Sequence, residues 1–492
     1  MTSSPLKTLE ADVSTPYQKL WIGGAWMDSS SGETFPVTDP ANGEAVGTAA
    51  AATPEDAGRA VEAAHEAFLS WRKVPPPERG AMLKEAAGRA RRSADEIGRL
   101  LTLEQGKPIQ EAIGEVKASA DALEFFAEES WRIVGETMPS QKSNRRSYVI
   151  KQPYGVVVAI SPWNYPILLM AWKLGPALVT GNTVVAKPPS ETPLAVSRFL
   201  EVLAEGGLPK GVVNIVSGRG RAIGPALIQH PRTAKVAITG QTESGKQVME
   251  MAAAGLKRIT LELGGHTPLI VFPDADLHKA VEGAAYRSFR NMGQICNAVN
   301  RIYVHRSLFG SFVEEFEDAT RKLTIGHGLD NPDLGPMCTA AGVQKVQRHI
   351  QDAVERGGRV LAGGRRPPGE KYARGHFFEP TVLVDVRHDM LVMREETFGP
   401  VAPIMPFDTN QEAIAYANDS PYGLVAYIYT HDVRVLTQVS EELEYGTVGV
   451  NNVAGGEFPY PYGGWKQSGL GVENSHYATE QYLQLKHVRI EI

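Results

Sequence analysis

Short apolar runs rich in β-branched residues recur between residues 156 and 272, and this repetition constrains the fold more than any other feature of the chain. Each run is apolar throughout, which indicates burial on both faces, as in a parallel sheet covered by helices. Segments with apolar residues at helical spacing separate the runs. The sequence therefore predicts a βαβαβ series and a doubly wound α/β fold. The runs are residues 156–160, 183–186, 212–216, 235–238 and 268–272, with helices expected near 166–180, 192–205, 220–229 and 243–255.

A second α/β series is expected from about residue 266 to 465. A chain of 492 residues exceeds what one hydrophobic core usually supports, which favours two or three domains. The final segment, residues 482–490, alternates apolar and polar residues and is expected to form a strand that can pair with a partner subunit. Further helices are expected at 54–70, 78–104, 108–133, 277–291, 308–323, 342–357 and 410–419, and further strands at 301–304, 401–406 and 424–429.

The composition argues against several classes of protein. A net charge of -6 is small for this length, and the basic residues between 84 and 92 fit a solvated helix face, so no nucleic-acid partner is expected. The most apolar run, residues 167–180, is interrupted by Lys173 and Pro176 and is too short to span a bilayer. Two cysteines without metal-ligand spacing favour a reducing compartment. With no secretory signal at residues 1–10, we expect a cytoplasmic protein that has no metal site and does not contact a membrane.

Cys296 and Glu262 are candidates for covalent catalysis. Cys296 lies in the stretch Arg-Asn-Met-Gly-Gln-Ile-Cys-Asn, and Glu262 lies upstream in Leu-Glu-Leu-Gly-Gly. A thiol attacks as the thiolate, and a nearby carboxylate can accept a proton from the thiol or from water. The alternative interpretation is a buried structural cysteine beside a loop glutamate.

Four successive buried runs each end in a turn that is able to bind a ligand. After the first, Asn164 is able to donate to an oxyanion, a contribution of roughly 3 kcal/mol to a transition state. After the second, Lys187 suits a ribose or a phosphate. Glycines at 218–220 and 240–245 leave backbone N–H groups free for a pyrophosphate. Taken singly, a turn asparagine, a surface lysine and ordinary loops explain these residues equally well, but the four turns together favour a dinucleotide.

Two later segments extend this pattern. In residues 395–400, Glu396 stands two residues before Phe398, and such a pair can hold a ribose diol and pack on a nicotinamide. A capped loop is the alternative. Residues 462–471 form a glycine-dense loop that is able to close over a site.

In this order the motifs resemble the aldehyde dehydrogenase superfamily over about residues 17–490. They are PWN at 162–164, the lysine–proline turn at 187–190, GxTxxG at 240–245, LELGG at 261–265, GQxC at 293–296, EExFGP at 395–400 and GGxKxSGxG at 463–471. The resemblance implies a Rossmann-like cofactor domain, an α/β catalytic domain and a small β element for oligomerisation. The expected bounds are 1–131 and 155–264 for the dinucleotide-binding domain, 265–465 for the catalytic domain, and 132–154 and 478–492 for the oligomerisation strands.

The resemblance also implies roles for individual residues. Cys296 would attack the aldehyde, Asn164 and the Cys296 N–H would hold the oxyanion, and Glu262 would activate the water that hydrolyses the thioester. Lys173 and Glu473 match a proton relay of some relatives, although both can equally be structural. The expected cofactor contacts are Ile160, Ser161, Trp163, Lys187, Ser190, Gly220, Gly240, Gln241, Glu396 and Phe398. The expected substrate contacts are Arg290, Tyr165, Trp172, Ile295, Asn297 and Tyr462.

Ser190 bears on the choice of cofactor. Strictly NAD-dependent relatives carry a glutamate there, and a carboxylate repels the 2′-phosphate of NADP. Serine makes NADP admissible, while the adjacent Glu191 keeps dual use of NAD and NADP open. Gln241 replaces a serine that is common in the family and is expected to alter the pyrophosphate contact.

Departures near Cys296 bear on the substrate. Arg290 resembles the arginine that succinate-semialdehyde dehydrogenases use for the substrate carboxylate; an ion-paired arginine at a helix end is the alternative. Trp172 stands where those enzymes have a second arginine, Ala298 replaces a cysteine of some of them, and Asn297 resembles lactaldehyde-type relatives.

We therefore expect hydrolytic, NAD(P)-dependent oxidation of a small acidic aldehyde such as succinate semialdehyde, by a homodimer or homotetramer. A lactaldehyde, glycolaldehyde or sulfolactaldehyde dehydrogenase is the alternative. Transfer of the acyl group to coenzyme A is disfavoured, because relatives that do so generally lack the glutamate found here as Glu262. A catalytically silent binding or structural protein on the same fold is an alternative of another class.

Overall fold

The apolar runs of the first series assemble into an eight-stranded sheet in the computed structural model, which describes residues 17–492. The five central strands pair in parallel, and the short strands at the two edges pair antiparallel. In sheet order the strands are β22 (Gly469–Leu470), β12 (Arg258–Glu262), β11 (Thr233–Thr239), β8 (Val156–Ile160), β9 (Thr183–Lys187), β10 (Val213–Ile215), β2 (Leu20–Ile22) and β3 (Ala25–Met27).

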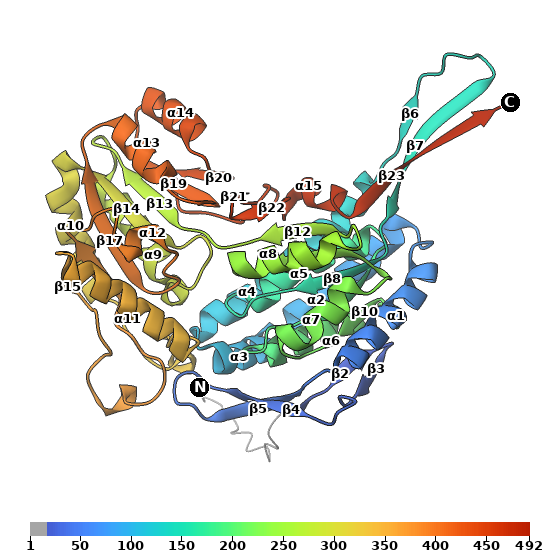
Figure 1. Ribbon diagram of the computed structural model, residues 1–492, viewed down its shortest axis with the longest axis horizontal. Helices are drawn as coiled ribbons and strands as arrows, with labels where there is room; N and C mark the ends of the chain where they lie inside the picture. Colours follow the sequence, from blue (N-terminus) through green and yellow to red (C-terminus); the bar gives the residue numbers. More distant parts are fainter. Residues whose placement is uncertain (1–16) are drawn as a thin grey trace, which may run out of the picture.

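Helices cover both faces of this sheet, which explains why its strands are apolar throughout (Figure 1). Val157 and Ala159 of β8 pack in one core with α2 to α6, whereas Val156 and Val158 pack in a second core with α1, α7 and α8. The helices are α1 (Pro54–Trp71), α2 (Pro76–Arg92), α3 (Ala94–Gln105), α4 (Ile109–Glu129), α5 (Pro166–Val179), α6 (Pro193–Glu205), α7 (Gly220–Gln229) and α8 (Thr242–Ala253).

A second sheet of seven strands forms the other half of the molecule, on the left in Figure 1. All its pairs are parallel except β15 with β16. Its order is β15 (Arg359–Ala362), β16 (Thr381–Val384), β17 (Val401–Phe407), β14 (Val299–His305), β13 (Thr267–Val271), β19 (Val425–Tyr429) and β20 (Thr447–Val450). Its helices are α9 (Leu277–Phe289), α10 (Arg306–Arg321), α11 (Ala340–Glu355), α12 (Leu391–Arg394), α13 (Asn410–Asn418) and α14 (Val433–Glu442).

A three-stranded antiparallel sheet projects away from both halves (Figure 1). The expected C-terminal strand is present as β23 (Leu483–Glu491), which pairs along its whole length with β7 (Arg145–Pro153). β6 (Glu136–Met138) lies on the far side of β7, so β23 is an edge strand. The remaining elements are β1 (Tyr17–Gln18), β4 (Thr34–Thr38), β5 (Ala45–Ala50), β18 (Tyr422–Gly423), β21 (Trp465–Lys466) and α15 (Ser475–Glu480).

The predicted α/β class is confirmed, with three differences in detail. The run at 268–272 belongs to the second sheet as β13, and the fifth central strand of the first sheet is β12, which continuous apolarity did not reveal because its residues alternate. The helix expected over 78–104 is two helices that meet at Ser93, where the backbone turns at φ -92° and ψ 11°. The part of the cofactor-domain prediction that covers residues 1–16 lies outside the described residues.

Candidate active site

The carboxyl ends of the parallel strands of the first sheet place several predicted residues side by side. Thr239 at the end of β11 is in register with Glu262 at the end of β12, and Ile160 at the end of β8 is in register with Lys187 of β9. In open α/β sheets this edge is where ligands bind. The turns that follow these strands open toward the second sheet.

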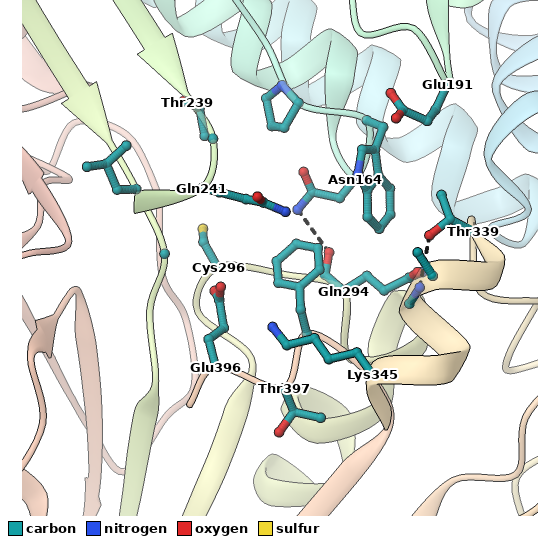
Figure 2. A pocket seen from close by; sticks show the side chains of 18 of the residues that line it. Asn164, Glu191, Thr239, Gln241, Gln294, Cys296, Thr339, Lys345, Glu396 and Thr397 are labelled. Carbon is teal, nitrogen blue, oxygen red and sulfur yellow. Dashed lines mark hydrogen bonds between the residues drawn. The ribbon is translucent and has the colours of Figure 1, made fainter. Parts of the chain in front are cut away.

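A cavity of about 370 Å³ lies at this edge and is lined from both halves of the molecule. Figure 2 shows Asn164, Gln241, Cys296 and Glu396 around the same space. The residues of the sequence prediction that line it are Trp163, Asn164, Gly240, Gln241, Cys296, Glu396 and Phe398. The structure thus brings the predicted nucleophile together with about half of the predicted cofactor contacts.

The loop that carries Cys296 is tightly bent. Asn291 and Met292 both have positive φ, 48° and 59°, a conformation that non-glycine residues adopt rarely and that clusters at functional sites. A side chain at Gly265 would collide with the carbonyl oxygen of Cys296, so glycine at 265 is required for this approach. Cys296 Sγ lies 3.3 Å from Tyr462 Oη. Burial and the neighbouring Glu262 raise the pKa of the thiol well above its usual value, so the thiol is the stable form here.

Asn164 points its amide toward the same space. Its Nδ2 donates to the carbonyl oxygen of Gln294 at 2.9 Å, which leaves its second N–H for another acceptor. Within residues 17–492 no group bonds to its buried Oδ1. Asn164 is only 3% exposed, so the free N–H is held in a desolvated site.

Glu262 is buried, and neither of its carboxylate oxygens has a hydrogen-bond partner in the described part of the chain. Burial and then the negative charge of Glu473 raise its pKa to about 8, and the positive charge of Lys173 opposes this shift. Lys173 Nζ donates to Thr239 Oγ1 and to Glu473 Oε1, both at 2.7 Å. The predicted relay pair, Lys173 and Glu473, is therefore in direct contact, and Thr239 lies between Lys173 and the end of β12.

Other predicted cofactor residues lie beyond the cavity, near the ends of β9 and β10. Ser190 Oγ donates to the carbonyl oxygen of Gly218 at 3.2 Å. A side chain at Gly220 would meet the Lys187 side chain at 3.8 Å, so these two residues are neighbours. Burial lowers the pKa of Lys187 to about 8. Ser161, whose buried Oγ has no partner among the described residues, directly follows β8.

Nearer the thiol, Glu396 and Phe398 form the opposite wall. Glu396 Oε1 accepts from the N–H of Gly265 at 3.0 Å, and burial raises the pKa of this carboxyl. The ring of Phe398 meets that of Trp163 edge to face, with centroids 5.5 Å apart. The φ of Phe398 is 53°, again in the left-handed region.

Three lining side chains were missed by the sequence analysis: Gln294, Thr339 and Lys345. Gln294 belongs to the motif that contains Cys296, but its role in fixing Asn164 depends on a contact between distant segments. Thr339 caps α11 and Lys345 lies on that helix, so only the packing of the second half against the first brings them here. No local motif marks them.

The predicted substrate residues surround the other approach to Cys296. Arg290 Nε donates to Glu111 Oε1 at 2.9 Å, and Tyr165 donates to the same carboxylate oxygen. Arg290 is therefore the ion-paired arginine that the sequence analysis gave as an alternative, although this contact alone does not test its role toward a substrate. Trp172 packs against Tyr462 with ring centroids 5.4 Å apart.

Two further predicted substrate residues flank Cys296 in the chain. Asn297 Oδ1 accepts from Arg287 Nη1 at 3.3 Å, a contact that the sequence did not indicate. Ile295 is buried in the main hydrophobic core.

Two searches of the described residues returned nothing. No group of three or more His, Cys, Asp or Glu side chains in residues 17–492 is arranged to hold a metal ion. Within the same range, every helix is too short or too polar to cross a membrane.

A thiol beside strand ends that suit a dinucleotide is typical of oxidoreductases that form a covalent intermediate on cysteine. The profile of the aldehyde dehydrogenase family matches residues 26–488. The chain therefore belongs to the aldehyde dehydrogenase family and is an oxidoreductase that acts on aldehydes.

Individual relatives cover nearly the whole chain. It is 44% identical to the succinate-semialdehyde dehydrogenase [NADP(+)] of Escherichia coli, over 96% of this chain and 98% of that one. It is 42% identical to the 3-sulfolactaldehyde dehydrogenase of Pseudomonas putida, over 97% and 98% of the two chains. Among solved structures, a betaine aldehyde dehydrogenase of Staphylococcus aureus in complex with NAD+ superimposes with a TM-score of 0.94, at 36% identity over 96% of this chain and 94% of that one.

Proposed function

We propose that Cys296, Asn164 and Glu262 carry out the aldehyde oxidation, with water as the final acyl acceptor. The observation that supports this most strongly is that the Cys296 thiol and the half-free Asn164 amide line one cavity, while the unpartnered Glu262 carboxyl is close enough to shift the pKa of the thiol. Each group alone has a structural explanation. Together they supply a nucleophile, an oxyanion donor and a base.

Cys296 attacks the carbonyl carbon as the thiolate, after Glu262 or a water has taken the thiol proton, and forms a thiohemiacetal. The free N–H of Asn164 and the backbone N–H of Cys296 stabilise its oxyanion. The nicotinamide, when bound, accepts the hydride from this carbon. Glu262, as the carboxylate, then accepts a proton from the water that attacks the resulting thioester, and the Cys296 thiolate leaves. The buried Lys173–Glu473 pair provides a route for that proton away from Glu262.

The residues present fit a dinucleotide. The orphaned hydroxyl of Ser161, the buried amine of Lys187 with only a backbone acceptor, and the aromatic wall of Trp163 and Phe398 are groups that a ribose phosphate and a nicotinamide would satisfy. We infer that both NAD and NADP are admissible. Position 190 carries no negative charge, and the neighbouring Glu191 lines the cavity.

For the substrate, we propose a small aldehyde with an acidic tail, such as succinate semialdehyde. Relatives at 44% identity carry this activity in their names, and Arg290 is a cation on the approach to Cys296. Because Glu111 already neutralises Arg290, a substrate carboxylate would have to compete with it. A hydroxylated or sulfonated aldehyde is the second candidate, favoured by two buried donors, Trp172 Nε1 and Tyr427 Oη, that have no partner in the described structure.

We also propose that β23 pairs with a second copy of the chain to give a homodimer, or a homotetramer built from two dimers. The strand is nine residues long, has one free edge, and exposes Leu485 and Ile490. A long exposed edge strand is otherwise a liability for aggregation.

The test is a panel of aldehydes run with both cofactors. Acidic, hydroxylated, sulfonated and unsubstituted aliphatic aldehydes of similar length would be compared by kcat/KM from NAD(P)H absorbance, with the acid product identified by mass spectrometry. We expect the acidic aldehydes to lead. A preference for the sulfonated or hydroxylated aldehydes would favour the second candidate, product that forms only with coenzyme A would contradict the hydrolytic step, and no turnover with any aldehyde would indicate a silent protein.

A further inference from the structure

A fully buried ion pair lies directly behind the Asn164 segment. Lys107, in the short connection between α3 and α4, has its Nζ 2.6 Å from Oε2 of Glu115 on α4, and both side chains are 0% exposed. Burying two charges costs free energy that only close pairing and further hydrogen bonds offset, and an apolar pair of similar volume is often no less stable. The remaining contacts of the pair therefore indicate what it does besides fill the core.

Lys107 uses all three of its donor directions. Besides Glu115, its Nζ donates to the backbone carbonyl oxygen of Asn164 at 2.6 Å and lies 3.7 Å from the centroid of the Tyr165 ring. An ammonium group has three N–H donors and no acceptor, so no donor is left over. Two of the three partners belong to the two-residue segment that links the turn after β8 to α5.

Glu115 fixes the other side of the same segment. Its Oε1 accepts from the N–H groups of Ile167 at 2.9 Å and of Leu168 at 3.3 Å, in the first turn of α5. A carboxylate satisfies donors that a helix leaves free at its start and is favoured there by the helix dipole. The pair thus holds the chain immediately before and immediately after Tyr165–Pro166.

The network continues to the loop that carries Cys296. Asn291 Nδ2 donates to the same Asn164 carbonyl oxygen at 3.2 Å, and Asn291 Oδ1 accepts from Gln105 Nε2 at 3.0 Å. Gln105 Oε1 in turn accepts from the backbone N–H of Lys107 at 2.9 Å. A closed set of buried contacts therefore relates the backbone of Asn164 to the bent segment that leads to the nucleophile.

We propose that Lys107 and Glu115 are positioning residues for the oxyanion donor. They fix the backbone of Asn164, while the Gln294 carbonyl fixes its side chain, so that the free N–H stays aimed at the oxygen of the thiohemiacetal. This rests on the role proposed above for Asn164. Positioning matters at this site because a displacement of about 1 Å in a reacting group can cost about 10²-fold in rate.

The test replaces both charges at once, because either single substitution would leave a buried charge unpaired. In Lys107→Met/Glu115→Gln the glutamine is still able to accept from the start of α5, but the ammonium contact to Asn164 is gone. The rate of the first NAD(P)H burst, measured by stopped flow at saturating aldehyde, should fall about 10- to 100-fold. The Kd for cofactor, measured by fluorescence titration, should stay within about 2-fold, because none of these residues lines the cofactor wall. Lys117→Met, an exposed lysine on the same helix, is the matched control and should leave the burst unchanged.

A double-mutant comparison separates positioning from general damage. Asn164→Ala should slow the burst by about 10²- to 10³-fold, and adding the Lys107/Glu115 changes to it should slow the burst no further. If the two losses multiply, or if the charge-free pair shows a wild-type burst while Asn164→Ala is slow, the positioning role is overturned. A wild-type burst in Asn164→Ala would instead remove the oxyanion role itself.

Asn291→Gly gives an independent variant in case the charge-free pair does not fold. It removes the second donor to the Asn164 carbonyl and keeps the left-handed backbone, since φ at 291 is 48° and glycine adopts this conformation freely. We expect a loss of about 3- to 10-fold in the burst rate, absent in the Asn164→Ala background. A loss of the same size in both backgrounds would contradict the proposal.

Discussion

The reacting end of the cavity and the approach that carries Arg290 differ in how their polar side chains are satisfied. At the reacting end, both oxygens of Glu262 and Oδ1 of Asn164 are buried and lack partners among residues 17–492. On the approach, Arg290 is paired with Glu111 and Asn297 is bonded to Arg287. Both regions are polar, but only the first holds its groups in reserve.

This difference implies different kinds of control. A buried polar group without a partner costs about 1–3 kcal/mol, which a folded protein tolerates where the missing partner is a substrate or a transition state. On the approach, any substrate group that binds Arg290 must first displace Glu111, so selectivity there is a difference between two contacts. Substitutions at the reacting end should therefore act on kcat, and those on the approach should act on KM.

The strongest test of the reacting end is Cys296→Ala. With no nucleophile, turnover should fall by about 10⁴-fold or more, while the Kd for cofactor changes little. The measurements are NAD(P)H absorbance and cofactor titration. Cys338→Ala is the control, because Cys338 is buried and makes only a backbone contact to Gln294, and it should remain active. Near-normal turnover in Cys296→Ala would remove this residue from its proposed role.

Glu262→Gln should act on the second half of the reaction. Loss of a general base typically costs about 10²- to 10⁴-fold, so thioester hydrolysis should slow by that factor while the first burst of NAD(P)H persists. The carboxyl is the protonated form below a pKa of about 8 and works as the carboxylate, so the wild-type steady-state rate should rise with pH and level off above about 8. The glutamine variant should lose this limb of the profile. A wild-type steady-state rate in Glu262→Gln would contradict the assignment.

The same group gives a stability readout that does not depend on turnover. Because burial raises the pKa of Glu262 above that of the unfolded chain, its folded form is favoured at low pH, and this contribution is lost as pH rises through about 8. Thermal unfolding of Glu262→Gln should accordingly depend less on pH between about 5 and 8 than that of the wild type.

The approach is tested by a pair of opposite changes. Arg290→Ala should raise the KM for succinate semialdehyde by about 10-fold and leave that for an uncharged aldehyde of the same length nearly unchanged, because a charged hydrogen bond is worth about 1.5–3 kcal/mol. Glu111→Gln should lower the KM for the acidic aldehyde about 2- to 5-fold, since it removes the competing carboxylate. Equal effects on both aldehydes would retire the anion-binding role of Arg290 in favour of a structural ion pair.

What the sequence predicts well in this molecule is local. The turn after a buried strand places Asn164, and the register of β11 with β12 follows from two adjacent apolar or alternating runs, so the sheet edge and its candidate ligands were within reach. The motif around Cys296 marks a nucleophile without any structure. The break of the long helix at Ser93 was not predictable from apolar spacing, because both halves keep the same period.

What the sequence does not predict depends on contacts between distant segments. Glu111 and Arg290 are 179 residues apart, so the neutralisation of the arginine emerges only when α4 packs beside the Cys296 loop. Lys345 reaches the cavity from α11 for the same reason. The charge of a side chain is written in the sequence, but whether that charge is already paired is a property of the fold.

Ser190 gives the smallest expected effect, at the nucleotide end of the molecule. Its hydroxyl donates to the Gly218 carbonyl, so it is partnered like the approach residues, yet it carries no charge that would exclude a second phosphate. Ser190→Glu should place a carboxylate where a 2′-phosphate would lie and lower kcat/KM with NADP about 10-fold by like-charge repulsion, while kcat/KM with NAD changes by less than about 3-fold. Ser190→Ala is the matched variant; it removes the same hydrogen bond without adding charge and should affect both cofactors alike. If Ser190→Glu depresses both cofactors equally, the residue does not contact the 2′-phosphate, and Glu191, which lines the cavity, becomes the group that sets the choice.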